Sequence, residues 1–204
     1  MNSKPKSQNK WDCWSVYYDY WPFRVFRWFQ KKALSELEIK PGNHFLDVGC
    51  GTGWAVNFIS GKMKYQGYFT GIDSSEGMIR KAKQTLNGNK NVNFIKASSD
   101  NMPLANESHH YIICTNSFHH YQNPGKVLNE MYRVLKPGGA LLILDVTRDN
   151  LFSGIFNLLL SKYEKDHVKF YSSDEYRSIF TSANFKYRQG PVYGLIFRIH
   201  LGIK

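Results

Sequence analysis

The chain has 204 residues, of which 42% are hydrophobic, so length and composition predict one domain with an ordinary packed core. Its apolar runs at residues 140–144 and 155–160 are far shorter than the roughly 20 residues of a membrane-spanning helix. The net charge of +11 suggests nucleic-acid binding, but the basic residues are spread along the chain, which favours solvated helix faces over a binding patch.

Residues 1–40 are predicted to be an aromatic-rich helical arm, set apart from a core at 41–204. A break is expected at Pro22, and basic residues gather at Arg24, Arg27, Lys31 and Lys32. Large side chains recur at alternating steps of three and four, and would share one helix face: Trp11, Trp14, Tyr18, Trp21, Val25 and Trp28. Two interpretations stay open, a stripe packed against the core or a lid over the substrate. The polar, lysine-rich residues 1–10 do not resemble a signal peptide.

Five apolar runs after the arm predict strands at residues 44–49, 68–73, 92–97, 111–115 and 140–146. Each is followed by a segment able to form a helix. This alternation predicts right-handed crossovers and a parallel sheet covered by helices on both faces.

Three local signals refine the second half of the chain. Pro124 can occupy the first turn of a helix with an apolar stripe at positions 127, 131 and 134, and Lys-Pro-Gly at 136–138 would end it. Ser172 and Glu175 have the spacing of a capping box. Residues 185–189 and 195–201 flank Gly190, Pro191 and Gly194, which predicts a hairpin.

The segment HFLDVGCGTGWA, residues 44–55, joins a predicted strand to a glycine-rich turn and then to a helix start. Gly49, Gly51 and Gly53 allow the backbone to turn sharply and to approach a ligand. A Rossmann dinucleotide site needs a glycine where Trp54 stands, so NAD is disfavoured. Asp73, about twenty positions further on, still indicates a ribose to be held.

Further blocks follow LDVGCGTG at regular spacing: GIDSSEGMIRKA at 71–82, NFIKASSDNMPL at 93–104, then YIICTNSFHHYQNP, and EMYRVLKPGGALLILD at 130–145. Together they resemble class I S-adenosylmethionine (AdoMet) dependent methyltransferases over most of the chain, and the HH and KPGG segments are most similar to the quinone-biosynthesis branch. The resemblance implies an α/β, single-domain, Rossmann-like seven-stranded sheet, mostly parallel, with an antiparallel last strand and helices on both faces. It implies AdoMet as cofactor and S-adenosyl-L-homocysteine as product.

The resemblance places the cofactor beyond the carboxyl ends of the strands. We expect the glycine turn under the methionine tail, Asp47 orienting the turn or the ammonium group through water, and Asp73 accepting bonds from the ribose diol. Ser74 and Met78 would flank adenine, although Met78 suits core packing equally well. In the third block Ser98 and Ser99 replace the usual Asp and small residue, so either Ser98 or Asp100 would receive the adenine amino group. The residues assigned to the cofactor are Asp47, Gly49, Cys50, Gly51, Gly53, Asp73, Ser74, Met78, Ser98, Ser99, Asp100 and Asn116.

The resemblance places the methyl acceptor near residues 116–120. A base is needed only if the acceptor must lose a proton, and histidine, with an ordinary pKa of about 6.5, is the natural candidate. We predict that His119, or else His120, contacts the acceptor, while a pocket-wall or capping role stays open for each. Tyr18 is a third catalytic candidate, because Tyr18-Asp19 stands where related methyltransferases carry a Tyr-Asp pair near the cofactor.

Cysteines and histidines predict no metal site. Cys13, Cys50 and Cys114 are odd in number and lack metal-ligand spacing, which fits a reducing cytoplasm. Cys50 is interpreted as a backbone contributor, since no base is evident beside its thiol. The pairs at 109–110 and 119–120 should lie at opposite ends of one strand, roughly 20 Å apart.

The predicted function is AdoMet-dependent methyl transfer, by in-line displacement, to a small and hydrophobic acceptor molecule. Two alternatives remain. An RNA-modifying methyltransferase is suggested by the charge, although Thr-Asn-Ser-Phe at 115–118 lacks the Asn/Asp-Pro-Pro-aromatic pattern of base-amino methyltransferases. A non-catalytic membrane-surface protein that retains the nucleotide fold is suggested by the basic, tryptophan-rich arm, and peripheral membrane contact would also suit a lipophilic acceptor.

Overall fold

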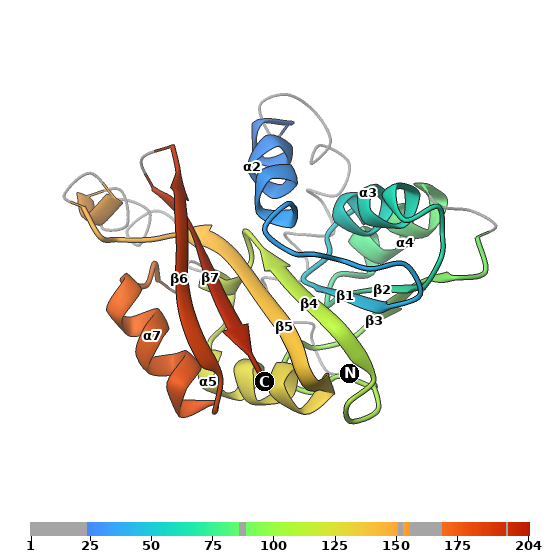
Figure 1. Cartoon of the computed structure of the whole chain (residues 1–204). Helices are drawn as coiled ribbons and strands as arrows, with labels where there is room; N and C mark the ends of the chain where they lie inside the picture. The colour runs from blue at the N-terminus through green and yellow to red at the C-terminus, as the bar shows by residue number, and fades with distance from the viewer. Residues whose placement is uncertain (1–23, 86–88, 151–152, 156–168, 195) are drawn as a thin grey trace, which may run out of the picture. The chain divides into compact units, whose positions relative to one another are not determined.

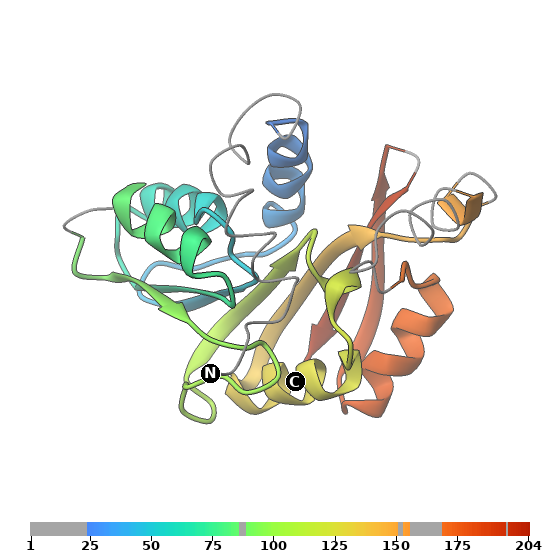
Figure 2. The ribbon, with the colours of Figure 1, turned by 180° about the vertical axis from the view of Figure 1, so that it is seen from behind.

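The computed structural model describes residues 24–85, 89–150, 153–155, 169–194 and 196–204. The chain divides into two compact units, residues 1–103 and 104–204 (Figures 1 and 2). Most of the aromatic arm, including Tyr18, lies outside the described residues, so its predicted roles and the expected boundary near residue 40 stay predictions.

The first unit alternates helices with parallel strands. Its elements are α2 (Arg24–Leu34), β1 (His44–Val48), α3 (Trp54–Lys62), β2 (Tyr68–Asp73), α4 (Glu76–Thr85) and β3 (Val92–Lys96). β2 lies between β1 and β3 and pairs with both in parallel. α3 packs on β1 and β2, and α4 on β2 and β3. The core is formed by apolar side chains with little exposure, among them Phe45, Leu46, Ile59, Phe69 and Ile72.

The second unit carries the remaining strands. Its elements are β4 (His109–Thr115), the 3₁₀ helix η1 (Phe118–His120), α5 (Pro124–Val134), β5 (Leu135–Val146), α7 (Ser173–Ser182), β6 (Lys186–Tyr193) and β7 (Phe197–Ile203). β4 and β5 are parallel, whereas β7 runs antiparallel to both β5 and β6. α7 packs against α5 and β6, and α5 against β5.

The strand order is β3-β2-β1-β4-β5-β7-β6. The expected fold class, a mostly parallel seven-stranded sheet with an antiparallel last strand, is confirmed. Within the described residues no helix is both long and apolar enough to cross a bilayer.

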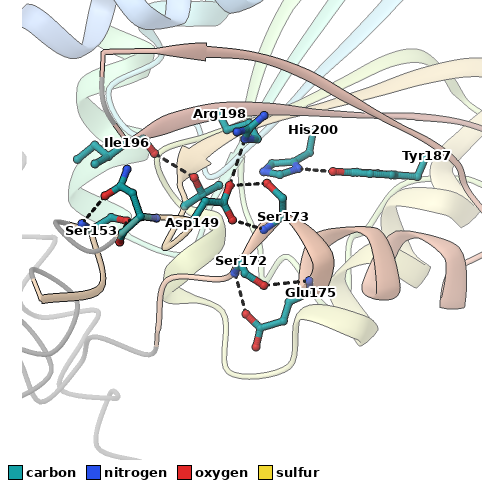
Figure 3. A network of polar contacts seen from close by, with 11 residues as sticks. Asp149, Ser153, Ser172, Ser173, Glu175, Tyr187, Ile196, Arg198 and His200 are labelled. Carbon is teal, nitrogen blue, oxygen red and sulfur yellow. Dashed lines mark hydrogen bonds and ion pairs between the residues drawn. The ribbon is translucent and has the colours of Figure 1, made fainter.

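Helix boundaries in the second unit follow local chemistry. Pro124 opens α5 as predicted, and the side chain of Asn123 caps it by accepting from the amide of Lys126 at 3.0 Å. The capping box of α7 is confirmed, since the Ser172 hydroxyl accepts from the Glu175 amide and the Glu175 carboxylate accepts from the Ser172 amide (Figure 3).

Two boundaries differ from the prediction. β4 begins two residues earlier, at His109, and β5 begins at Leu135, because Leu135, directly after α5, pairs with His109. The Lys-Pro-Gly segment at 136–138 lies inside β5, at the register shift that follows this pair. The hairpin is confirmed, but Gly190 and Pro191 lie inside β6 at a register shift rather than in its turn. A Cβ atom at Gly190 would lie 2.9 Å from Cβ of Ile199, so glycine permits the strands to approach there.

A carboxylate ties the end of β5 to the start of α7 (Figure 3). Asp149 accepts from both the amide and the hydroxyl of Ser173, at 2.7 and 2.6 Å. It also pairs with Arg198 of β7 at 3.2 Å. These bonds fix both ends of the connection between β5 and α7 to the sheet.

Candidate functional site

A tight glycine turn follows β1 in the first unit. Gly49, Gly51 and Gly53 have φ angles of 76°, 53° and 80°, in the left-handed region that residues with a side chain rarely adopt. The amides of Gly49 and Cys50 both donate to the carbonyl oxygen of Ile72 at 2.9 Å. The sharp turn predicted for this block is therefore present, and it is anchored to the end of β2.

Gly53 is also constrained by packing. A Cβ atom at this position would lie 2.7 Å from Cζ of Phe94 and 3.0 Å from Cβ of Ala82. α3 begins at the next residue, Trp54. The missing side chain therefore allows the helix to start close to β3 and α4, which is a structural role beside the predicted cofactor contact.

Asp73, at the end of β2, holds the glycine turn through its carboxylate. One oxygen accepts from the amide of Gly51 and the other from the amide of Ser75, each at 2.9 Å. The Ser75 hydroxyl in turn accepts from the amide of Met78 at 3.2 Å and so caps α4. A carboxylate can accept several hydrogen bonds at once, which suits the two hydroxyls of a ribose.

Asp47, on β1, is buried with a relative exposure of 2%. Its Oδ1 atom has no hydrogen-bond partner among the described residues. Burial, and then the charge of Asp73, raise the pKa of Asp47 to about 8. A buried carboxyl oxygen without a donor is costly unless a ligand supplies one, so Asp47 fits a site for a cationic group such as the ammonium of AdoMet.

Cys50 and Met78 have core-like surroundings. Burial, followed by the charges of Asp73 and Asp47, raises the pKa of the Cys50 thiol well above its ordinary value. A thiol held neutral is a poor nucleophile, which agrees with a backbone role for Cys50. Met78 has 2% of its surface exposed and Ser74 is exposed. The packing interpretation of Met78 therefore stands beside its predicted contact with adenine.

The third block forms a turn after β3. The amide of Asn101 donates to the carbonyl oxygen of Ser98, and the Ser98 hydroxyl donates to the carboxylate of Asp100 at 2.5 Å. Ser98 and Asp100 are thus coupled rather than independent candidates for the adenine amino group. Ser99, between them, is half-buried, and its predicted adenine contact stays a prediction.

Taken within the first unit, these residues fit AdoMet. The glycine turn exposes backbone, Asp73 offers acceptor sites for a diol, and Asp47 has a buried oxygen without a donor. When bound, AdoMet would supply a methyl group activated by a sulfonium.

Asn116 follows β4 in the second unit. Its φ angle is 55°, which is uncommon for a residue other than glycine. Both polar atoms of its side-chain amide are buried without a hydrogen-bond partner among the described residues. Strained backbone and unsatisfied polar atoms together indicate a ligand position, and the sequence assigned this residue to the cofactor.

His119, in η1, is joined to a fully buried carboxylate on β5. Its Nδ1 lies 2.6 Å from Oδ1 of Asp145, and its backbone amide donates to Oδ2 of the same side chain at 2.9 Å. The amide of Val146 adds a third bond to Asp145, at 2.8 Å. Burial alone would raise the pKa of Asp145, but the histidine and the two amides outweigh it and hold that pKa below its ordinary value.

His120 lies beside His119, with ring centroids 3.9 Å apart. Phe170 meets the His119 ring edge-on at 5.3 Å. Of the three predicted catalytic residues, His119 and His120 are therefore adjacent, while Tyr18 lies outside the described residues. His109 and His110 stand at the opposite end of β4, as their spacing predicted.

Asp145 was not among the predicted site residues. A signal existed, because it is the lone charged residue in the apolar run ALLILDV that ends β5. A carboxylate at the end of a buried strand must have a partner.

Comparison with known proteins gives consistent similarities. Residues 46–143 match a family described as "Methyltransferase domain". A demethylmenaquinone methyltransferase from Listeria monocytogenes serotype 4a is 28% identical over 158 residues, and the match covers 73% of this chain and 66% of the relative. The chain thus spans about two thirds of the length of such relatives.

Solved structures agree on the fold. A SAM-dependent methyltransferase from Aquifex aeolicus aligns with a TM-score of 0.72 and 26% identity, covering 99% of both chains. A chain from the complex between the Haloferax volcanii Trm112 methyltransferase activator and a methyltransferase aligns with a TM-score of 0.83 and 19% identity, covering 96% of both chains. At that identity the second likeness concerns the fold alone.

Proposed function

Because this chain is a class I S-adenosylmethionine-dependent methyltransferase, we propose that it methylates a small, hydrophobic acceptor molecule. The observation that carries AdoMet binding is the pair of carboxylates on either side of the glycine turn, Asp47 near the end of β1 and Asp73 at the end of β2. The proposed acceptor class is supported by the resemblance to demethylmenaquinone methyltransferases.

The residues of the first unit are assigned to cofactor binding. Asp73 receives the ribose hydroxyls while its bonds to Gly51 and Ser75 keep the turn in place. Asp47 accepts from the ammonium group of the methionine tail, directly or through water. Gly49 and Gly51 permit the backbone to approach the tail.

The residues of the second unit are assigned to the acceptor. Asn116 offers an amide for a polar group of the acceptor or cofactor, and His119 or His120 provides a base where a proton must leave. Transfer to a well-oriented acceptor can rest largely on alignment, with effective molarities of about 10⁵ M or more attainable.

Contact with an anionic membrane surface is a second element of the proposal. Trp28 of α2 is 53% exposed, and the ammonium of Lys32 lies 5.7 Å from its ring centroid. Lys31 and Lys32 are both exposed, and the first turn of α2 carries no acidic residue. An exposed indole among lysines suits a lipid interface, where a lipophilic acceptor would be found.

Calorimetric titration with AdoMet and with S-adenosyl-L-homocysteine tests cofactor binding. An acceptor screen that includes demethylmenaquinone in its reduced form then tests the substrate class. Gel-shift measurements with total RNA over a salt series address the RNA alternative, since phosphate contacts predict a steep loss of binding with salt. Absence of AdoMet binding at millimolar concentration would refute the proposal.

We also expect a cytoplasmic location. The buried free thiols of Cys50 and Cys114 support that expectation.

A further inference from the structure

We propose that Asp145 is a positioning residue that keeps His119 in the tautomer protonated at Nδ1, so that Nε2 is basic and the methyl acceptor is one that must surrender a proton. This inference rests on the proposed function and adds to it a substrate class and a residue that sequence reasoning did not select.

The first step concerns the orientation of the imidazole. Asp145 contacts His119 twice: its Oδ1 lies 2.6 Å from the ring Nδ1, and its Oδ2 accepts from the backbone amide at 2.9 Å. Two bonds from one carboxylate to one residue fix both the backbone of η1 and the ring relative to β5. Rotation of the ring would break the shorter bond, so Nδ1 stays on the side of Asp145 and Nε2 on the opposite side.

The second step concerns the proton. Asp145 is fully buried and already accepts from the amides of His119 and Val146. A carboxylate that accepts several bonds is held ionised, so the proton between Oδ1 and Nδ1 resides on the histidine. In a neutral imidazole, protonation of Nδ1 leaves the lone pair on Nε2.

The third step concerns the burial cost. Burying the Asp145 carboxylate costs desolvation free energy, and apolar side chains could hold a short 3₁₀ helix without that cost. The side chain of His119 remains 13% exposed, so its ring is not sealed in the core. The fixed carboxylate decides which ring nitrogen faces away from β5, as in other carboxylate–histidine pairs.

The chemistry follows from this arrangement. The new bond forms between the methyl carbon and the acceptor atom, and the bond from that carbon to sulfur breaks with its electron pair left on sulfur. The proton of the acceptor passes to Nε2 of His119, and Asp145 stabilises the resulting imidazolium. Acceptors of this class include a phenolic hydroxyl and the ring carbon of a hydroquinone. A tertiary amine has a lone pair and no proton to lose, so its methylation would not need His119 and Asp145.

The decisive measurement is nitrogen NMR of protein labelled in its histidine rings, which needs no acceptor. We expect the His119 ring to carry its proton on Nδ1 in the wild-type protein and to lose that preference in Asp145→Asn. Asp149→Asn is the matched control, since Asp149 is another carboxylate of the same unit that bonds to Ser173 instead. A wild-type ring protonated at Nε2 would overturn the proposal, whether or not Asp145→Asn folds.

Kinetics give the second readout. With AdoMet and reduced demethylmenaquinone as probes, His119→Gln and Asp145→Asn should each lower kcat by about 10²-fold or more, while KM changes little. The double variant should lose no more than His119→Gln alone, because Asp145 acts through His119. Unchanged kcat in His119→Gln would refute the inference. Failure of AdoMet to bind the wild-type protein in calorimetry would instead refute the proposed function.

Discussion

His200 makes folding of the second unit sensitive to acid. It lies on β7, fully buried, with its ring stacked on Tyr176 at a centroid distance of 3.7 Å. Its Nδ1 meets the Tyr187 hydroxyl at 2.8 Å (Figure 3), whereas Nε2 is buried without a partner among the described residues. Burial chiefly lowers its pKa, to about 3; Arg198 lowers it further, while Asp145 and Asp149 act in the opposite direction.

The magnitude follows from proton linkage. In the unfolded chain the histidine has a pKa of about 6.5, so it binds a proton at pH 5 while the folded His200 stays neutral. The stability that neutral His200 contributes is complete above pH 6.5 and falls as the pH drops towards 3. At about 1.36 kcal/mol per pH unit, moving from pH 8 to pH 5 should cost about 2 kcal/mol.

The assay is urea unfolding of the wild type and His200→Phe at pH 8, 6.5 and 5. The variant keeps a ring against Tyr176, but phenylalanine does not titrate. Between pH 8 and pH 5 the wild type should therefore lose about 2 kcal/mol more unfolding free energy than His200→Phe. Other titrating groups, Asp47 among them, act in both proteins and cancel. Tyr187→Phe is the control, because it removes the hydrogen bond and keeps the histidine. Equal pH dependence in the wild type and His200→Phe would refute the reasoning.

Three further outcomes can be measured directly. Asp73→Ala should weaken AdoMet binding by about 1 to 3 kcal/mol, the scale of a lost charged hydrogen bond, and unchanged affinity in calorimetry would show that the ribose is held elsewhere. AdoMet binding at pH 7 should release about 0.9 proton, because Asp47 with a pKa of about 8 must ionise; titrations in buffers of different ionisation enthalpy measure this, and the release should vanish in Asp47→Asn. Ser172→Ala removes one half of the α7 capping box and should lower the free energy of unfolding by about 1 kcal/mol, and a change near zero in urea titrations would contradict this.

The sequence predicted elements best where one local signal dominates. Four of the five apolar runs became strands within a residue or two of the expected bounds, and the capping box at Ser172 formed as its spacing indicated. The predicted strand boundaries were wrong where strand pairing extends a strand through residues that usually end one. β5 continues back through Pro137, and β6 runs through Gly190 and Pro191, because residues on both sides of each segment pair with a neighbouring strand and the segment itself forms an irregularity between them.

The candidate site shows the same division. Gly49 and Asp73 could be selected because their residue types suit a turn and a diol, and the turn is present. Asp145 could not be selected in this way, since its significance depends on η1 returning to β5, a contact between residues 26 positions apart. The coupling of Ser98 to Asp100 likewise depends on a turn that no single residue type announces.

The space opposite Gly53 is already filled by the Phe94 ring and the Ala82 methyl. A related protein without methyltransferase activity would still need a glycine at this position, or would need a different contact of α3 with β3 and α4. Gly53 is therefore required by the packing of the scaffold, and Asp73 shares that role through its bonds to Gly51 and Ser75. Among the described residues of this turn, Oδ1 of Asp47 is the buried oxygen that only a ligand would satisfy.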